Sequence, residues 1–444
     1  MKGPVDPGVR GGPPGAGDPL NDLTADEKAF FQDGIGRFAD VEVVAGGNNN
    51  GLGPRFNSNQ CLSCHSQPAP GGTSAAQNPL IEIATLNGAK NMVPWFIAKN
   101  GPIREARFKR NPNGTNDGGV HDLFVITGRS DAGACDIAQP NFLPAGNPVT
   151  GQGGNPNIIF RIPTPVFGAG LIEAIPDSVI LANMQANAPL KATLGISGHP
   201  NAHLSGNANR SANDGTITRF GWKAQNKSLL MFAGEAYNVE MGISNQLFPQ
   251  ERDETASCLF NATPNDTLNF TTTPTGTATS NPAVISDIEA FANFMRMLAP
   301  PTQAPDTPST AKGRAAFASV GCVHCHTPSL RTGKMIASGS STVPSAALSN
   351  QTANLFSDLL VHHMGRGLAD DITQGGAGPD EFRTAPLWGV GQRVFFLHDG
   401  RTSNLVEAIE AHRSPGSEAN RVIERFNRLK TEEQQDIINF LRSL

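Results

Sequence analysis

Apolar residues recur at helical spacing in only a few parts of this 444-residue chain. The first such part begins after Thr24, and Glu27 three residues later completes the pattern of a capping box. The spacing predicts a helix that ends before residue 60 and buries one aromatic face. Its apolar residues are Phe30, Phe31, Ile35 and Phe38.

Three more helices are predicted in the second half of the chain. Ser286–Leu298 repeats apolar residues at helical intervals, and Lys312–Ser319 is a short helix that leads directly into a cysteine motif. Thr431–Gln434 reads as a second capping box. The helix that it opens has an apolar side made of Ile437, Ile438, Leu441 and Leu444.

The stretch between these helices predicts loops and a few short strands. Residues 71–281 are rich in Gly, Asn, Pro and Thr, and the whole chain has 48 Gly and 34 Pro. The short apolar runs Leu123–Thr127 and Ile158–Ile162 fit small strands. Prolines at 300 and 301 end the helix that precedes them, and residues 302–309 form a Pro-rich linker.

Two distant segments share one pattern, which indicates an internal duplication. Residues 160–170 and residues 382–391 both begin with Phe-Arg and continue with proline, an aliphatic residue, an aromatic residue and Gly-small-Gly. One residue of slippage separates the two parts of the match. Each segment lies downstream of its own cysteine motif, so two related domains are the better interpretation.

The two motifs, Cys61–His65 and Cys322–His326, both read Cys-x-x-Cys-His. Two thiols one helical turn apart can bond the two vinyl groups of one porphyrin, and the next histidine can ligate the iron. A structural zinc site needs four ligands, and neither motif has a second cysteine pair nearby. We therefore predict two covalently bound haem c groups. Cys61, Cys64, Cys322 and Cys325 attach them, and His65 and His326 are the proximal iron ligands.

The two remaining cysteines, Cys135 and Cys258, are expected to pair. Haem c is normally attached outside the cytoplasm, so we expect a periplasmic or secreted protein whose leader peptide has been removed. Met1–Pro19 itself is rich in Gly and Pro and does not resemble a signal peptide. Buried free thiols are the alternative to a disulfide.

Composition excludes two classes of partner. The net charge is −5 and the pI is about 6.1, so no basic surface for nucleic acid is expected. No apolar run approaches the roughly 18 residues that a membrane-spanning helix needs.

His412 is the candidate sixth ligand of the second haem iron. It follows Leu405, Ala408 and Ile409 on one apolar helical face, where a histidine nitrogen needs a partner. A core histidine bonded to a backbone carbonyl is the structural alternative. His362, His363 and Met364 are competing ligands.

The first haem has no equally placed histidine or methionine, which favours an open sixth position where peroxide or dioxygen binds. The segment from Arg161 to Glu173 is the candidate distal wall, with Phe167 as an apolar cover and Glu173 as a proton-transfer group. Trp222 is a candidate electron relay, and the neighbouring Arg219 and Lys223 are candidates for pairing with haem propionates. Packing roles are the alternatives for Phe167 and Trp222, and a solvated acid for Glu173.

With these residues in view, the chain resembles the dihaem oxidoreductase/peroxidase family within the bacterial dihaem cytochrome c peroxidase superfamily, which also includes relatives of the rubber oxygenases. The likeness runs from about Thr24 to Leu444. The matching segments are Arg55–Gln60, Asn100–Phe108, Gly170–Asp177, Arg219–Ala224, Glu240–Ile243, Asp358–Gly365 and Phe396–Arg401.

The resemblance implies a mainly α fold with two tandem cytochrome c-like haem domains, long loop-rich insertions and a few short strands. We expect a flexible segment at 1–20, a first haem domain at 21–299, a linker at 300–310 and a second haem domain at 311–444. The resemblance leaves calcium open, because Arg393-Val394-Phe395 replaces the Thr-x-Pro that helps to bind it in relatives.

The resemblance also implies a division of labour. The first haem would react with peroxide, and the second would exchange electrons with an external donor or acceptor protein. A distal ligand of the second iron from the helix after His-Asp-Gly again indicates His412. Two alternatives stay open, an oxygenase or oxidase that activates dioxygen on an organic substrate, and an electron-transfer cytochrome without catalysis.

Overall fold

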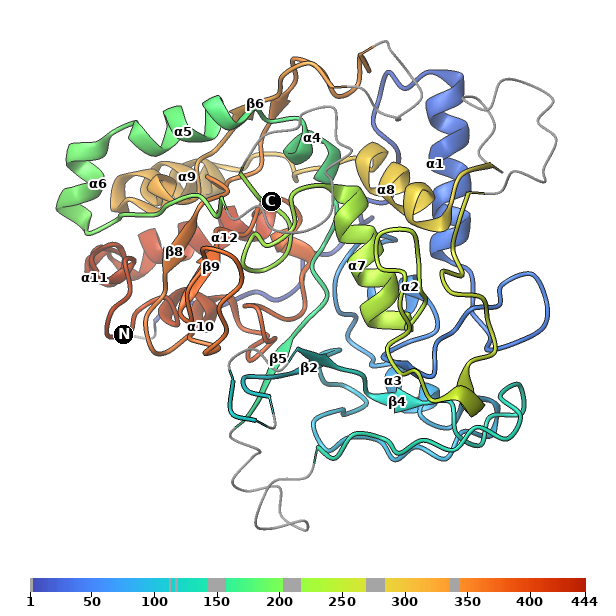
Figure 1. The fold of residues 1–444 in the computed structure, drawn as a ribbon. Coiled ribbons are helices and arrows are strands. Elements are labelled where there is room, and N and C mark those ends of the chain that lie inside the picture. The colour runs from blue at the N-terminus through green and yellow to red at the C-terminus, as the bar shows by residue number, and fades with distance from the viewer. Residues whose placement is uncertain are drawn as a thin grey trace. The chain divides into compact units, whose positions relative to one another are not determined.

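A computed structural model describes residues 3–111, 113–115, 119–142, 157–202, 217–268, 284–335 and 344–444. It confirms a mainly helical fold with a few short strands (Figure 1). The chain forms two compact units, each assembled from separate stretches of sequence. One unit contains residues 24–165 and 230–294, and the other contains residues 1–23, 166–229 and 295–444. None of the helices in the described parts is long and apolar enough to cross a membrane.

The unit with the first cysteine motif is built around α1 (Ala25–Phe38) and α8 (Asp287–Met297). The capping box at Thr24 is confirmed, since its Oγ1 accepts the Glu27 N–H at 3.2 Å and Glu27 accepts the Thr24 N–H at 2.8 Å. Helix α8 begins where Asp266 accepts the N–H groups of its first two residues. The same unit also contains α2 (Cys61–Cys64), α3 (Leu80–Ile83) and most of α7 (Leu229–Met241).

Short antiparallel strands complete this unit. Strand β2 (Glu105–Phe108) pairs on one side with β3 (Val120–His121) and on the other with β5 (Ile158–Arg161). Strand β1 (Arg55–Phe56) pairs with β4 (Phe124–Val125). Both runs predicted as strands are therefore strands, although each is shorter than expected. The predicted Cys135–Cys258 disulfide is also present.

The unit with the second motif has a core between α9 (Pro308–Val320) and α12 (Thr431–Ser443), which lie side by side (Figure 1). Helix α9 begins four residues before the predicted start, because Thr307 caps it by accepting the Thr310 N–H. The predicted capping box at Thr431 is wrong by one residue. Lys430 is the N-cap of α12, and its N–H is bonded to Glu433.

Smaller elements surround that core. The helices are α4 (Ala169–Glu173), α5 (Asp177–Gln185), α6 (Ala188–Leu194), α10 (Leu405–Glu410) and α11 (Asn420–Arg428). The strands form two antiparallel pairs, β6 (Leu330–Arg331) with β7 (Thr352–Ala353), and β8 (Val361–His363) with β9 (Glu381–Arg383).

The N-terminal segment belongs to this same unit and is not a free tail. The carboxylate of Asp6 binds the Arg442 guanidinium through two hydrogen bonds of 2.8 and 2.6 Å, and both side chains are buried. The Arg10 N–H donates to the carbonyl of Gly391 at 2.8 Å. The expectation of a flexible segment at 1–20 missed these bonds, because a Gly- and Pro-rich composition does not show which residues have a partner elsewhere.

Equivalent close contacts occur in the two units. Gly34 in α1 lies against the Ala290 carbonyl and the Phe294 Cβ of α8. Gly313 in α9 lies in the same way against Asp436 and Phe440 of α12. In each pair the phenylalanine is four residues beyond the contacted carbonyl, so the two helix pairs match residue by residue. This match is independent of the Phe-Arg repeat and supports duplication.

The Phe-Arg repeat has a structural counterpart as well. Its first glycines, Gly168 and Gly389, both adopt left-handed backbone with φ of 64° and 75°, at the start of a short helix. Its second glycines, Gly170 and Gly391, both lie against an arginine carbonyl, where a Cβ would overlap with the oxygen. Only glycine fits such an approach, which explains why the two segments share their glycines.

Candidate functional site

Each cysteine motif forms a single helical turn. The His65 N–H donates to the Cys61 carbonyl at 3.0 Å, and the His326 N–H donates to the Cys322 carbonyl at 2.9 Å. The four motif thiols are half-buried and are not joined in disulfides. A single turn is the backbone conformation expected between two cysteines that attach one haem.

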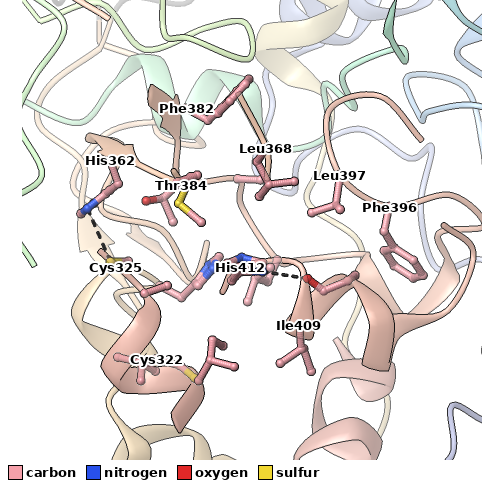
Figure 2. A pocket seen from close by; sticks show the side chains of 18 of the residues that line it. Cys322, Cys325, His362, Leu368, Phe382, Thr384, Phe396, Leu397, Ile409 and His412 are labelled. Atoms are coloured by element: carbon pink, nitrogen blue, oxygen red, sulfur yellow. Dashed lines mark hydrogen bonds between the residues drawn. The ribbon is translucent and has the colours of Figure 1, made fainter. Parts of the chain in front are cut away.

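A large, mostly apolar cavity adjoins the second motif (Figure 2). Its empty volume is about 1340 Å³, including the open solvent at its mouth. Its lining is mostly apolar with a few polar side chains, which is the usual character of a cofactor site. Cys322, Cys325, His326 and His412 all line it.

His326 and His412, two of the histidines that line this cavity, are held in the same way. The Nδ1–H of His326 donates to the Phe356 carbonyl at 3.0 Å, and the Nδ1–H of His412 donates to the Ala408 carbonyl at 2.8 Å. Each ring keeps Nε2 as its acceptor nitrogen, which is the state that a metal-ligating imidazole needs. Burial lowers the pKa of His326 to about 4, so this ring is neutral at pH 7.

His65 of the first motif repeats this arrangement. Its Nδ1–H donates to the Gly72 carbonyl at 3.0 Å, and burial lowers its pKa to about 4. Phe38 of α1 lies edge-on to the His65 ring, with centroids 6.0 Å apart. Phe317 of α9 lies beside His326 at 6.2 Å, so the two proximal rings have equivalent aromatic neighbours.

Helix α10 positions His412. Asn404 caps this helix by accepting the N–H groups of Val406 and Glu407, and the helix ends just before His412. The apolar residues that predicted this face, Leu405, Ala408 and Ile409, line the same cavity. His412 and the second motif therefore line the same cavity.

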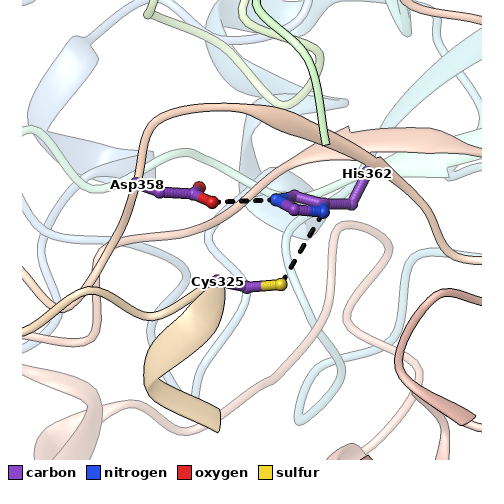
Figure 3. A group of neighbouring side chains, drawn as sticks. All are labelled: Cys325, Asp358 and His362. Carbon is purple, nitrogen blue, oxygen red and sulfur yellow. Dashed lines mark hydrogen bonds and ion pairs between the residues drawn. The ribbon is translucent and has the colours of Figure 1, made fainter. Parts of the chain in front are cut away.

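His362, one of the competing ligands, is fully engaged by carboxylates. Its Nε2 lies 2.9 Å from Asp358, and the Cys325 sulfur lies 3.6 Å from its Nδ1 (Figure 3). Its Nδ1 also lies 2.8 Å from Glu418. The neighbouring Cys325 and the Asp358 carboxylate raise its pKa despite burial. Neither ring nitrogen of His362 is left for iron.

The other two competitors differ in position. His363 is half-exposed, with Nδ1 bonded to Asp380, and it does not line the cavity. Met364 does line the cavity. Of the three competing ligands, only Met364 is therefore still compatible with binding the second haem iron.

Two buried arginines in the cavity wall were not found from the sequence. Arg383 and Arg393 form no ion pair among the described residues, and Nε and Nη2 of Arg393 have no hydrogen-bond partner there. Burial lowers the pKa of each to about 10. Buried guanidinium groups without an anion are costly, and a carboxylate is their usual partner. The propionates of a haem in this cavity would satisfy them.

The arginine and lysine that the sequence suggested for propionates have other partners. Arg219 pairs with Asp177 and donates to backbone carbonyls, including that of Ile175. Lys223 pairs with Asp370 at 3.0 Å. Neither lines the cavity. Sequence position next to Trp222 was the only reason to choose them, and it did not reveal these nearer acids.

Trp222 itself is in the cavity wall. Its ring is edge-on to His398 at 6.4 Å, and the Arg393 guanidinium lies 6.0 Å from its centroid. An indole in contact with the cavity agrees with a relay role, which stays a prediction.

The candidate distal residues of the first haem have structural contacts. Glu173 is buried, with one oxygen accepting Arg296 Nε and the other accepting the Leu229 N–H. Phe167 is buried near the start of α4, and Arg161 is buried at the end of β5. Phe167 and Glu173 belong to the unit of the second motif, whereas Arg161 and His65 belong to the other. Their roles at the first haem stay predictions.

The motif cysteines, the oriented imidazoles and the buried arginines without an acid partner among the described residues fit a haem-binding site. Residues 155–444 match the family described as "Di-haem oxidoreductase, putative peroxidase". This match spans more than half of the chain, and the chain belongs to this family of dihaem enzymes. The second motif lies inside the match and the first lies before it.

Several solved structures are similar over part of their length. Hydrazine synthase from Kuenenia stuttgartiensis is 20% identical over 36% of this chain and 55% of its own, with a TM-score of 0.22. A MauG-like protein associated with microbial copper homeostasis is 18% identical over 36% and 52%, with a TM-score of 0.23. The chain thus spans about half the length of each.

The dihaem peroxidase BthA from Burkholderia thailandensis is 16% identical over 64% of this chain and 86% of its own, with a TM-score of 0.29. These scores are too low to establish a shared fold. No curated protein is significantly similar to the chain.

Proposed function

We propose that this protein is a c-type dihaem peroxidase in which the two haems have different tasks. Cys61–His65 holds the haem that reacts with peroxide, and Cys322–His326 holds the haem that passes electrons to or from an external partner protein. Each haem would lie in one of two duplicated domains. The matched glycine contacts of Gly34 and Gly313 support that duplication.

The observation behind this proposal is the pair of imidazoles in the cavity beside the second motif. His326 and His412 both line it, and each has its Nδ1–H bonded to a backbone carbonyl. Two imidazole ligands keep an iron low-spin and inert to substitution, which suits electron transfer. His412 is thus proposed as the sixth ligand of the second haem.

Bound haem supplies the iron that exchanges electrons with peroxide. The protein's residues hold and tune it. Cys322 and Cys325 would attach the haem, His326 would ligate its iron with a ring oriented by a backbone carbonyl, and Arg383 and Arg393 would pair with its propionates. The apolar wall, with Leu405 and Phe396 among its residues, excludes water from the cavity.

The first haem is proposed to have an accessible sixth position. His65 has the backbone bond of a proximal ligand, and no second histidine or methionine was found for this haem from the sequence. An open position lets peroxide reach the iron. Phe167, Glu173 and Arg161 remain the proposed distal residues, with Trp222 as the proposed relay.

The disulfide supports an oxidising location such as the periplasm or the cell exterior. This location is also where haem c is attached and where an external electron donor would meet the protein. Calcium has no support beyond the resemblance.

Replacement of His412 tests the proposal. Wild-type protein should show one low-spin and one high-spin haem by electron spin resonance, and cyanide should bind the high-spin haem readily. His412→Gly should convert the low-spin signal to high-spin and lower peroxide turnover with an external donor. Cyanide binding to the first haem should stay unchanged.

His363→Gly is the matched control, because it removes a half-exposed histidine from the same unit. It should leave both signals as they are. Met364→Leu addresses the remaining competitor. If Met364→Leu abolishes the low-spin signal and His412→Gly does not, Met364 is the ligand and the assignment of His412 is wrong. Two low-spin haems that do not react with peroxide would instead indicate an electron-transfer protein without catalysis.

A further inference from the structure

Tyr237 is the single tyrosine of the chain, and it lies buried in α7 between two carboxylates. Its phenolic oxygen is 3.2 Å from an oxygen of Glu42 and 3.2 Å from an oxygen of Asp287. The O–H can donate to only one acceptor at a time. A buried phenol with two acid acceptors can therefore release its proton without water.

The two acids are not equivalent. Asp287 also accepts a hydrogen bond of 2.8 Å from the Arg37 guanidinium, which stabilises its negative charge and weakens it as a base. Glu42 is buried and forms no ion pair among the described residues. Burial, reinforced by Asp287, raises the pKa of Glu42 to about 7. Glu42 is the better proton acceptor of the two.

Aromatic rings connect Tyr237 with the first motif. Tyr237 is edge-on to Phe291 at 5.0 Å, Phe291 is edge-on to Phe38 at 6.3 Å, and Phe38 is edge-on to the His65 ring at 6.0 Å. All four residues belong to one unit. Two aromatic rings, each in contact with the next, thus connect the phenol with the proposed proximal ligand.

We propose that Tyr237 is a redox-active residue that donates one electron to the haem held by Cys61–His65 while its phenolic proton passes to Glu42. The oxidant is that haem after a peroxide has oxidised it, so this inference rests on the proposed function. One electron leaves the phenol and reduces the oxidised haem by one equivalent. The phenolic O–H bond breaks, and an O–H bond forms on Glu42.

The product is a neutral tyrosyl radical. An external reductant restores the phenol by supplying one electron, and Glu42 returns the proton. Tyr237 would thus store one oxidising equivalent inside the protein until the external partner supplies an electron. The proposed acceptor and the aromatic path are both needed for this role, whereas a tyrosine that only fills space needs neither.

Isotope labelling tests this step without changing the fold. Ring-deuterated tyrosine labels Tyr237 alone, because the chain has no other tyrosine. The holoprotein is mixed with hydrogen peroxide, frozen within milliseconds and examined by electron spin resonance. The expected result is a radical signal whose hyperfine structure narrows on deuteration. A signal that deuteration leaves unchanged, or no radical despite a peroxide-induced change in the haem spectrum, would overturn the inference while the proposed function stands.

Two variants test the residues. Tyr237→Phe should abolish the signal, and Glu42→Gln, which still accepts a hydrogen bond but cannot take the proton, should lower its yield by roughly 10- to 100-fold. Glu82→Gln in α3 is exposed and serves as the matched control, with an unchanged yield. An unchanged yield in Glu42→Gln would exclude Glu42 as the acceptor. A haem spectrum that ignores peroxide in wild-type protein would overturn the proposed function and this step together.

Discussion

Gly34 of α1 lies directly against the carbonyl oxygen of Ala290 in α8, so that the two helices meet at backbone distance. A Cβ at position 34 would overlap with that oxygen and would approach the Phe294 Cβ to 2.9 Å. This contact lies one turn before Phe38, which packs against the ring of His65. The glycine thereby sets how closely α1 can place its aromatic residue beside the motif histidine.

Gly34→Ala should destabilise the protein by about 1–3 kcal/mol, because the inserted methyl group forces the helices apart. Gly36→Ala in the same helix is the matched control, since Gly36 is exposed with nothing within 4 Å of the added Cβ. It should stabilise by up to about 1 kcal/mol through helix propensity. Midpoints of urea unfolding compare the two. Equal shifts would show that the close contact is not needed.

The Cys135–Cys258 disulfide should resist alkylation. Denatured protein treated with iodoacetamide should have neither residue modified before reduction and both modified after it. The bridge spans 123 residues of sequence, so replacing both cysteines with serine should cost about 2–4 kcal/mol. Mass spectrometry of tryptic peptides locates the label. Modification of both residues without reductant would rule out the bridge.

Arg393→Gln should lower the reduction potential of the second haem. A buried positive charge stabilises the reduced iron, which has one positive charge fewer, so its loss favours the oxidised form. We expect a decrease of roughly 30–90 mV, since 59 mV corresponds to a tenfold change for one electron. Arg314→Gln, at an exposed ion pair with Asp306, is the control and should have no effect. A potential that rises or stays constant in Arg393→Gln would argue against a site beside the haem.

Stability should fall as the pH rises from about 5 to 8, because of buried acids around Tyr237. Burial raises the pKa of Glu42 from 4.5 to about 7, and that of Asp266 from 3.8 to about 7. Between the unfolded and folded values the folded state binds more protons, so unfolding becomes easier with increasing pH, by at most about 1.4 kcal/mol for each pKa unit and group. Below pH 4 and above pH 8 these two groups do not change the free energy of unfolding further with pH.

Glu42→Gln should flatten this dependence, since the amide does not ionise. Thermal melting at pH 5, 6, 7 and 8 compares the variant with wild-type protein, and Glu82→Gln again provides the control. The expected result is a smaller loss of melting temperature between pH 5 and 8 in Glu42→Gln alone. Parallel curves for all three proteins would show that Glu42 is ionised as easily in the folded state as in the unfolded one.

Local patterns predicted α1, α8, α9 and α12, two of the strands and both cysteine motifs, because each depends on residues close together in sequence. The Thr24 cap and the His412 face are examples. Helices α5, α6 and α7 lie in the stretch that was expected to contain loops, and they were missed. The buried arginines could not be predicted, since Arg383 and Arg393 differ from surface arginines only in what surrounds them. The grouping of residues 166–229 with the C-terminal segment depends on distant contacts such as Gly170 with Arg296.

The contacts of the proposed distal residues could not be predicted for the same reason. Sequence order placed Phe167 and Glu173 after the first motif, and order suggested that they serve the first haem. The bonds of Glu173 to Arg296 and Leu229 depend on residues 123 and 56 positions away. No spacing rule at the level of a single motif reports such contacts.

The ion pair between Asp6 and Arg442 has a consequence for how the protein is made. The two residues are 436 positions apart, so Asp6 leaves the ribosome long before its partner is synthesised. The ion pair can therefore form only after α12 has been synthesised. Deleting the first ten residues should accelerate the proteolysis of newly made chains more than that of mature protein. The nascent unit then lacks the ion pair between Asp6 and Arg442.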